Sequence, residues 1–259
     1  MRYFIIISAI IALGLTMLID KAHAKETLIS VSVLSHDAKF IGTSMGGVNI
    51  TIRDVIKGEI LAQGVTKGST GNTNKIMAET IRRHQKLRSE GSARFDTKLD
   101  IKKPTKVEIS AYGPLAQPQS ARSITQQRII IPGKNYNDSN AILLHMPGMS
   151  VDILAPQAHL KRDFDPQGKL TLRANIMKMC GCPLRDQAPW KANDYEVEAL
   201  IYKNGSELIA TQELQFTGND SQFTTEISLN QPGSYEIYVT AYDPRTKDSG
   251  MDITTVILK

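Results

Sequence analysis

The sequence is short of cysteine, of aromatic residues and of long runs of one charge. It contains two cysteines and one tryptophan, and aromatic residues make up 6% of its 259 residues. Two cysteines cannot supply the several disulfides that hold small secreted domains together. The net charge of +5 is spread out, with no run of Lys or Arg longer than two residues. Since no nucleic-acid-binding motif accompanies it, the sequence predicts no nucleic-acid partner.

Catalytic signatures are scarce as well. The sequence has no P-loop and no H-E-x-x-H zinc motif. His36 and Asp37 are adjacent and would suit an acid and a base, but no nucleophile with supporting spacing accompanies them. The hydrophobic fraction of 41% is ordinary for a globular protein and sufficient for a packed core. We therefore expect a folded protein that is not an enzyme.

The first 24 residues have the layout of a secretory signal peptide. Arg2 precedes an apolar run of 17 residues, 3–19, and Ala22–Ala24 reads as a small-x-small cleavage site. An uncleaved anchor is the alternative, but the run is short for a span of about 20 residues. No later stretch is apolar enough to cross a membrane. We expect cleavage after Ala24 and a mature chain, 25–259, that is periplasmic or secreted.

The mature chain is rich in alternating apolar and polar residues. Thr27–Leu34 is rich in β-branched residues, and Val48, Ile50 and Ile52 alternate with polar residues. From Val151 onward about seven more strand-like segments follow, which is the strand number of an immunoglobulin-like sandwich. They are near 151–154, 169–177, 195–203, 207–215, 222–229, 234–242 and 252–258.

The sequence predicts an all-β protein of two domains, 25–150 and 151–259. Pro147 and Pro156 flank the point where the alternating pattern starts again. Asn204-Gly205 suits the turn of a β-hairpin in the second domain. One segment, Asn72–Glu90, breaks the pattern because its apolar residues recur at helical spacing. We expect a short helical insert there, in the first domain, with a long basic loop as the alternative.

Two stretches resemble known families. Residues 46–71, GGVNITIRDVIKGEILAQGVTKGSTG, resemble the opening hairpin of carboxypeptidase-regulatory-like, or transthyretin-like, domains. Residues 231–243, QPGSYEIYVTAYD, resemble a late strand of bacterial immunoglobulin-like domains, with Tyr235 in the aromatic position. The resemblance implies two such β-sandwiches in tandem. It also implies a scaffold for adhesion, substrate presentation or small-ligand capture, and no enzyme.

The two cysteines, Cys180 and Cys182, enclose only Gly181. Joined to each other they would stabilise the fold by about 1.6 kcal/mol, against about 4.7 kcal/mol for a disulfide that closes a 100-residue loop. Gly181 would have to relax the backbone, because alternate residues of a strand lie too far apart for a disulfide. Three interpretations stay open: a disulfide that pins a loop around Trp190, a thiolate pair that binds a soft metal ion, and a site of thiol–disulfide exchange.

Nearby methionines favour the metal interpretation. In an extended strand from Leu170, Lys178 and the cysteines share the core face, with Lys178 at a frayed end, while Met177 and Met179 lie on a face that should be wet. A second soft cluster lies at the expected domain boundary. Thioethers and thiolates suit copper(I), and thiolates also suit zinc. The candidate metal ligands are Cys180, Cys182, Met177, Met179, His145, Met146 and Met149.

The leading hypothesis is an exported, non-catalytic binding protein that holds a soft metal ion, copper, through the Cys-Gly-Cys and methionine cluster. The first alternative is a structural or adhesive β-sandwich module of a cell-surface or periplasmic assembly, with an oxidised cysteine pair and exposed strand edges. The second alternative is a thiol–disulfide exchange protein. The predicted partner is a metal ion or another exported protein.

Overall fold

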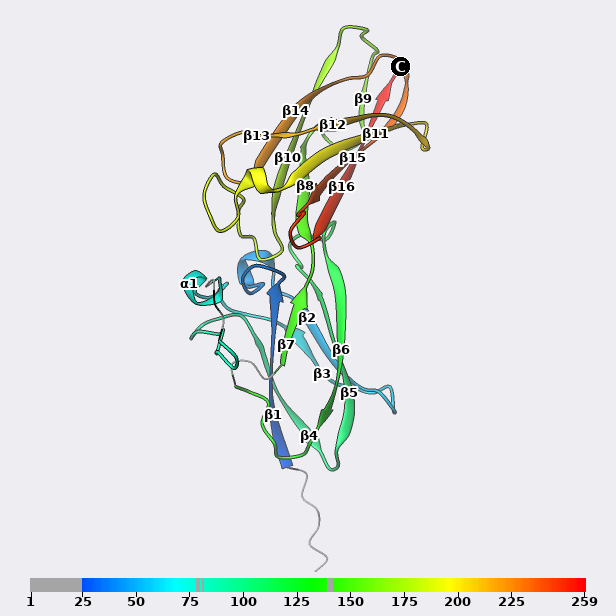
Figure 1. Cartoon of the computed structure of the whole chain (residues 1–259). Coiled ribbons are helices and arrows are strands. Elements are labelled where there is room, and N and C mark those ends of the chain that lie inside the picture. Colours follow the sequence, from blue (N-terminus) through cyan, green and yellow to red (C-terminus); the bar gives the residue numbers. More distant parts are fainter. Residues whose placement is uncertain (1–24, 78–79, 81, 139–141) are drawn as a thin grey trace, which may run out of the picture.

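The structure is a computed structural model that describes residues 25–77, 80, 82–138 and 142–259. Its strands form four sheets, arranged in two pairs that follow one another along the molecule (Figure 1). The predicted signal peptide, 1–24, lies outside the described residues. The described chain is mostly β-strand, as the alternating pattern predicts.

The N-terminal pair of sheets contains seven strands. One sheet has the order β4-β1-β7 and the other the order β3-β2-β5-β6. β1 runs parallel to β7, and the other neighbours are antiparallel. Alternate residues of β5, among them Val107 and Ile109, point into a core shared with Val31 and Ile50. The strands are β1 (Lys25–Ser35), β2 (Asn49–Asp54), β3 (Ile60–Val65), β4 (Phe95–Ile101), β5 (Thr105–Gly113), β6 (Arg122–Ile130) and β7 (Ile142–Met146).

The C-terminal pair of sheets has its own core. Its sheets have the orders β13-β14-β10-β8 and β12-β11-β15-β16-β9. Leu172 and Ile176 of β10 pack there with Val197 of β11 and Ile237 of β15. The strands are β8 (Met149–Ala155), β9 (Leu160–Arg162), β10 (Lys169–Lys178), β11 (Glu196–Lys203), β12 (Glu207–Glu213), β13 (Gln215–Phe216), β14 (Gln222–Ser228), β15 (Gly233–Tyr242) and β16 (Ser249–Leu258).

The seven segments predicted after residue 150 all form strands, and the sequence did not predict the short β9. The N-terminal pair ends with β7 and the C-terminal pair begins with β8 at Met149, so the predicted boundary falls inside β8. Asn204 and Gly205 have positive φ angles, 51° and 84°, as a hairpin turn of that sequence requires. The loop is three residues long, because Lys203 pairs with Glu207.

The helix predicted over Asn72–Glu90 is much shorter than expected. Within the described residues the structure has one α-helix, the four-residue α1 (Thr73–Ile76). The Asn72 side chain caps it by accepting a hydrogen bond from Lys75 N. Residues 82–90 are turn and coil, while 78, 79 and 81 lie outside the described residues. Lys75 Nζ donates to the Arg88 carbonyl at 2.8 Å, which stabilises a loop instead of further helical turns. So short a helix depends on such tertiary contacts.

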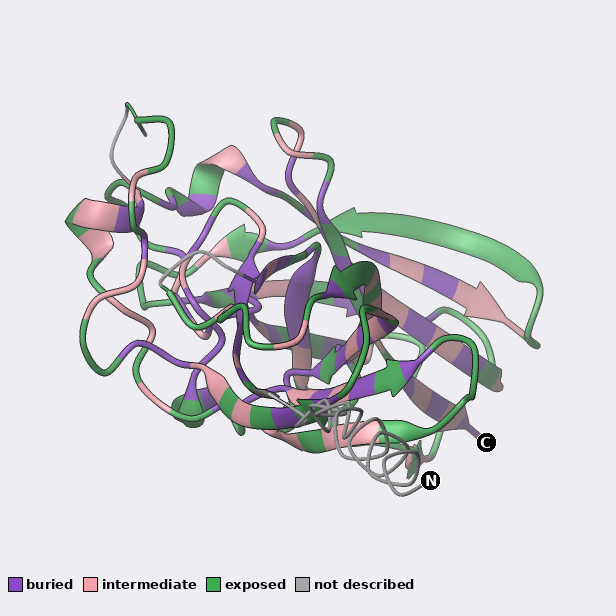
Figure 2. Cartoon of the chain, turned by 90° about the horizontal axis from the view of Figure 1, so that it is seen from below, coloured by how far each residue is buried: buried purple, intermediate pink, exposed green. Residues whose placement is uncertain are grey.

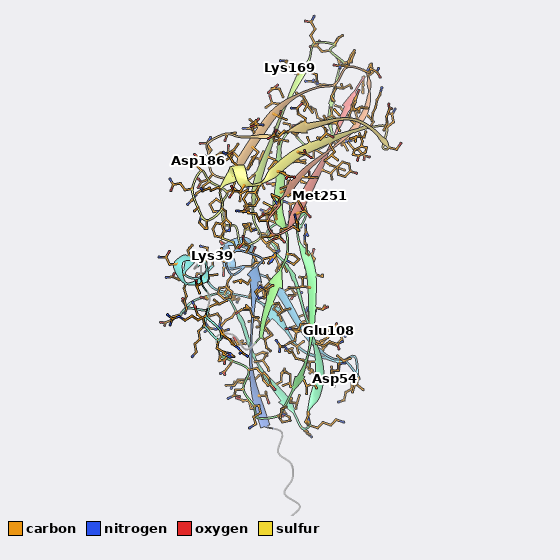
Figure 3. The ribbon with its side chains drawn as sticks, in the orientation of Figure 1. Lys39, Asp54, Glu108, Lys169, Asp186 and Met251 are labelled. Carbon is orange, nitrogen blue, oxygen red and sulfur yellow. A yellow bond between two sulfur atoms is a disulfide. The ribbon has the colours of Figure 1, made fainter. Side chains whose placement is uncertain are left out.

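The chain crosses from the N-terminal to the C-terminal pair between β7 and β8, through Pro147 and Gly148. The two pairs meet in a junction, which Figure 3 shows with Lys39 on its N-terminal side and Met251 on its C-terminal side. Arg122 donates across it to the Ser249 carbonyl at 2.6 Å. No helix in the described part of the chain is both long and apolar enough to cross a membrane.

Candidate functional site

The Cys-Gly-Cys loop follows β10 directly and reverses the chain. Gly181 N donates to the Lys178 carbonyl at 2.8 Å, and Lys178 N donates to the Cys182 carbonyl at 3.1 Å. Gly181 has a φ of 75°, which brings the Cα atoms of Cys180 and Cys182 to 5.3 Å, and the two cysteines form a disulfide. Gly181 thus adopts a positive φ, which glycine tolerates best, and so allows two cysteines this close in sequence to bond, as the sequence predicts.

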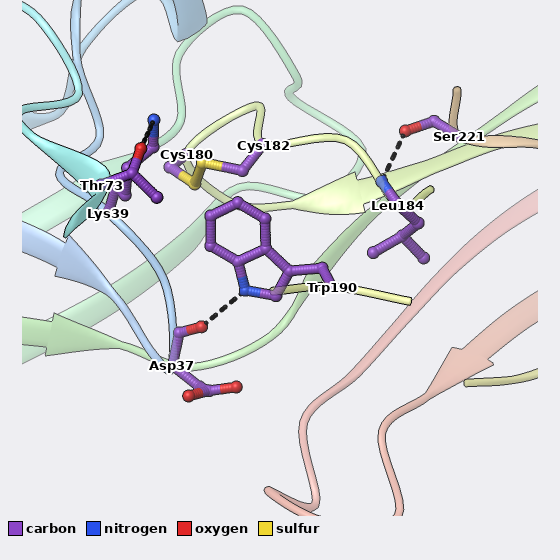
Figure 4. The surroundings of a disulfide bond; sticks show 8 residues. All are labelled: Asp37, Lys39, Thr73, Cys180, Cys182, Leu184, Trp190 and Ser221. Atoms are coloured by element: carbon purple, nitrogen blue, oxygen red, sulfur yellow. Dashed lines mark hydrogen bonds between the residues drawn. A yellow bond between two sulfur atoms is a disulfide. The ribbon is translucent and has the colours of Figure 1, made fainter. Parts of the chain in front are cut away.

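The disulfide lies at the junction beside the only tryptophan (Figure 4). Cys180 and Cys182 are 1% and 4% exposed and belong with Trp190 to the core of the C-terminal pair. Trp190 Nε1 donates to the Asp37 carbonyl of the N-terminal pair at 2.9 Å. The disulfide and Trp190 thus lie together at the junction, as the first of the three interpretations requires, while its restraining effect on the loop around Trp190 stays a prediction.

The methionines do not lie on a wet face. Met179 is fully buried in the core of the N-terminal pair, and Met177 packs against that core. The end of β10 runs into the junction, so the N-terminal pair covers the face that an isolated sandwich would expose to water. Flexible thioether side chains suit such an irregular contact between two surfaces. The junction thus accounts for methionines on that face without a metal.

The second predicted cluster is divided between the two cores. Met146 is fully buried in the N-terminal core and Met149 in the C-terminal core. His145 directly precedes Met146 on β7, and partial burial together with the charge of nearby His36 lowers its pKa. Within the described residues, no group of three His, Cys, Asp or Glu side chains is arranged to hold a metal ion. The oxidised cysteines offer no thiolate, so copper binding stays a prediction for the reduced protein.

Sequence reasoning placed Lys178 on the core face but at a frayed strand end. Lys178 is the last residue of β10, but it is fully buried and not frayed. Its Nζ lies 3.8 Å from Asp243 Oδ2 and 3.7 Å from Asp248 Oδ2, two carboxylates that are also buried. The sequence indicates this burial, because Lys178 lies two residues after the buried Ile176 and so faces the same side of the strand. A buried charge needs partners, and these come from the loop after β15, far away in sequence.

The buried carboxylates tie this charge cluster to both halves of the molecule. Asp248 accepts a hydrogen bond from Gly148 N, and its Oδ2 lies 3.0 Å from His36 Nδ1. Burial would raise the pKa of Asp243, but hydrogen bonds from Arg245, with the charges of Arg245 and Lys178, hold that pKa below its usual value. Burial, and then the charge of Asp243, raise the pKa of Tyr195.

A cleft of about 280 Å³ opens at the junction beside the disulfide, and the half-buried Lys39 lines it. Lys39 Nζ donates to Thr73 Oγ1 at 3.1 Å (Figure 4). Ser44 of the stretch Gly42–Gly46, GTSMG, also lines the cleft. This stretch matches the G-x-S-x-G spacing of a nucleophile elbow, which sequence reasoning overlooked. Ser44 lies in a single 3₁₀ turn rather than between a strand and a helix, and no described histidine or carboxylate hydrogen-bonds to it.

The C-terminal pair has one strand that is exposed along its whole length. All seven residues of β12, ELIATQE, are exposed, and Figure 2 shows one strand that is green from end to end. β12 lies at the edge of its sheet and pairs only with β11 among the described strands. Its other edge therefore presents unpaired backbone N–H and C=O groups to the solvent.

Glutamates gather where β12 ends. Glu213 lies directly opposite Glu198 of β11, and such a like-charged cross-strand pair is destabilising. Neither side chain has an ion pair within the described residues. At the other end of β12, Leu208 lies opposite Tyr202, whose ring meets that of Tyr238 edge-on at 5.6 Å. Next to the free edge, the outer face is therefore apolar at Leu208 and Tyr202, with Glu236 of β15 beyond Tyr202, and acidic at the other end.

Comparison with known proteins gives little guidance. No family model matches the chain, and no curated protein matches it. Among solved structures, the fibronectin(III)-like modules of Clostridium thermocellum CbhA align over 92% of this chain and 87% of theirs, with 11% identity and a TM-score of 0.30. An engineered protein aligns with 50% of the chain, at 14% identity and a TM-score of 0.32, and the match spans 24% of its own length.

Proposed function

We propose that the protein is an exported, non-catalytic structural module of a cell-surface or periplasmic assembly, which joins another polypeptide through the free edge of β12. The single observation that carries this proposal is that every residue of β12 is exposed, on a strand that pairs with only one other strand of the described chain. The two pairs of sheets are proposed to be a transthyretin-like sandwich, 25–150, and an immunoglobulin-like sandwich, 151–259, in tandem.

The middle of β12 supports an assembly role. Natural edge strands avoid accidental pairing by means of charged side chains, especially Lys, and by Pro, bulges or a covering loop. β12 contains no Lys and no Pro, its two charged residues, Glu207 and Glu213, lie at its ends, and it has one bulge, at Ile209. The five residues between the glutamates are uncharged, and Leu208 and Ile209 are 51% and 40% exposed. Such an edge is the surface that strand addition by a partner uses.

Export is supported by two independent features. The first 24 residues have the layout of a cleaved signal peptide. Cys180 and Cys182 form a disulfide, a bond that persists in oxidising compartments and is rare in the cytosol. Thiol–disulfide exchange stays a lesser proposal, since both cysteines are buried and would have to become accessible to react.

Site-specific photo-crosslinking in the source cells tests the assembly role. A photoreactive residue at position 211, near the middle of β12, is compared with one at position 173, which is exposed on β10 and has a paired strand on both sides. We expect one adduct of defined mass at position 211 and none at position 173. Equal labelling at both positions, or no adduct at position 211, would contradict the proposal.

A further inference from the structure

We infer that the strand which pairs with β12 carries a lysine or arginine opposite Glu213 and an apolar residue opposite Leu208, and that it comes from a different polypeptide rather than from a second copy of this chain. This inference rests on the proposed function and specifies the chemistry of its partner. It follows from the pairing of β12 with β11, from the charges on the outer face and from the sequence of β12 itself.

The charge argument begins with Glu198 and Glu213. They are cross-strand partners on the outer face, both are exposed, and neither is ion-paired within the described residues. Glu196 lies two residues before Glu198 and so adds a third carboxylate on the same face. This acidic face belongs to a chain whose net charge is +5. A cation on an added strand, opposite Glu213, would lie next to that carboxylate, and about two strand spacings from Glu198. Its charge would offset the repulsion between the two glutamates.

The apolar residue that we infer in the partner strand lies opposite the other end of β12. The bulge at Ile209 keeps Leu208 opposite Tyr202, so Leu208, Thr211 and Glu213 share the outer face. A side chain on an added strand opposite Leu208 would cover this apolar position and exclude water from it. The partner strand must therefore carry a cation and, about four residues further along on the same face, an apolar side chain.

A second copy of this chain fits poorly. Strand edges often pair with the same strand of another copy about a two-fold axis. β12 contains no lysine and no arginine. No register in which β12 of a second copy pairs with β12 of the first therefore places a cation opposite Glu213, and the repulsion between Glu198 and Glu213 would remain.

Capped synthetic peptides test the inference on the mature, oxidised protein. The probe Thr-Lys-Thr-Thr-Thr-Val-Thr has the cation and the apolar residue on one face. Matched peptides carry Gln or Glu in place of Lys, and a fourth is the Lys peptide with methylated backbone nitrogens, which cannot donate along a strand edge. Affinity is measured by titration, and hydrogen exchange of residues 207–213 reports whether the peptide pairs with β12.

We expect the Lys peptide to protect β12 and to bind about threefold to fivefold more tightly than the Gln peptide, with the Glu peptide weakest, given roughly 1 kcal/mol for an opposite-charge cross-strand pair. The methylated peptide should not protect β12. Glu213→Lys should reverse the order of the Lys and Glu peptides. Glu226→Lys, which reverses an exposed charge on β14, should leave the order unchanged.

The outcomes separate the inference from the proposed function. If all three unmethylated peptides protect β12 equally, the edge accepts a strand but the inferred charge of the partner is wrong. If the methylated peptide binds as well as the Lys peptide, the attraction is not strand pairing and the inference fails. If no peptide protects β12, both proposals are contradicted. Sedimentation that shows β12-dependent self-association, lost in Glu213→Lys, would contradict the exclusion of a second copy.

Discussion

At the scale of single residues, Lys178 shows how a buried charge is held. Its ammonium group is fully buried, has no hydrogen-bond partner among the described residues and relies on two carboxylates just beyond hydrogen-bond distance. The Tyr195 ring, 5.8 Å from the ammonium, adds a cation–π contact. Parity in β10 predicts the burial of this residue, but no local pattern predicts Asp243 and Asp248 as its partners.

Removing this charge should cost far more stability than removing an exposed one. Lys178→Met leaves two buried carboxylates near each other, and we expect a loss of about 3–5 kcal/mol in the free energy of unfolding. Lys98→Met, the matched control, breaks an exposed pair with Glu26 that is shorter, at 3.0 Å, and should cost less than about 1 kcal/mol. Denaturant unfolding measures both. Equal losses would show that the buried cluster is not held by its charge.

Acid should unfold the protein partly through Asp243. Because the pKa of Asp243 is lower in the folded protein than in the unfolded chain, the carboxylate stabilises the fold above its unfolded pKa. That contribution is lost as the pH falls below about 4 towards the folded pKa. Arg245→Gln removes the hydrogen bonds that lower this pKa, so the acid unfolding midpoint should rise by about a few tenths of a pH unit. Circular dichroism against pH measures this midpoint.

Arg185→Gln is the control for the acid experiment. Arg185 pairs with Asp220 at 2.7 Å, but both side chains are more than half exposed. The solvent screens this pair, so its loss should leave the acid midpoint unchanged. A midpoint that shifts equally in the two variants would mean that general charge, and not the buried Asp243, sets the acid limit.

At the scale of elements, strands were predictable and helix was not. Alternation identifies β5 and β10 because each has one face in a core, and period-two burial is a local property. The helical spacing in Asn72–Glu90 predicts too long a helix. Ile76 ends α1, while Leu87 reaches the same small core from a loop that the hydrogen bond from Lys75 Nζ to the Arg88 carbonyl holds in place. The exposure of both faces of β12 could not be predicted either, because it depends on how far the opposite sheet extends.

The Cys-Gly-Cys loop gives a prediction about Gly181. Its φ is positive, and an added Cβ would lie 2.7 Å from the Sδ atom of Met45, a residue that is 5% exposed. Gly205 also has a positive φ, but an added Cβ there would meet nothing within 4 Å. We expect Gly205→Ala to cost about 1 kcal/mol from backbone strain alone, and Gly181→Ala to cost about 1–3 kcal/mol more.

Unfolding measurements on Gly181→Ala/Met45→Ala, beside the parent variant Met45→Ala, check the cause of that difference. If the clash with Met45 is responsible, Gly181→Ala should cost no more in the Met45→Ala background than Gly205→Ala costs in the wild type. An undiminished cost would assign the effect to the loop itself rather than to its contact with the other half of the molecule.

At the scale of the whole molecule, the junction sets the candidate site. Residues 212 positions apart, His36 and Asp248, meet there, and so do Trp190 and Asp37, 153 positions apart. Local patterns could not predict such contacts. The sequence therefore did not predict that Met177 and Met179 pack against the core of the N-terminal half, and the metal site stays a prediction. A Cys-Gly-Cys disulfide beside Trp190 was one of the three interpretations that the sequence left open, and the structure places the two side by side.

Met179 should couple the two halves during unfolding. It belongs to the chain of the C-terminal half but is buried in the core of the N-terminal half. We expect the wild-type protein to unfold in one calorimetric transition, and Met179→Ala, which costs about 2–5 kcal/mol, to separate it into two. Met251→Ala, at a methionine that is 51% exposed, should leave a single transition. Two transitions in the wild type would contradict this coupling.

The connection through Pro147 and Gly148 has a consequence for what happens when the junction opens. With only these two residues between β7 and β8, the separated faces remain tethered at an effective concentration that for short linkers is at least about millimolar. Contacts too weak to hold two free proteins together would therefore keep this molecule closed most of the time. Each opening would be a brief hinge motion. It would end when the same two faces dock again, before another protein could bind either face.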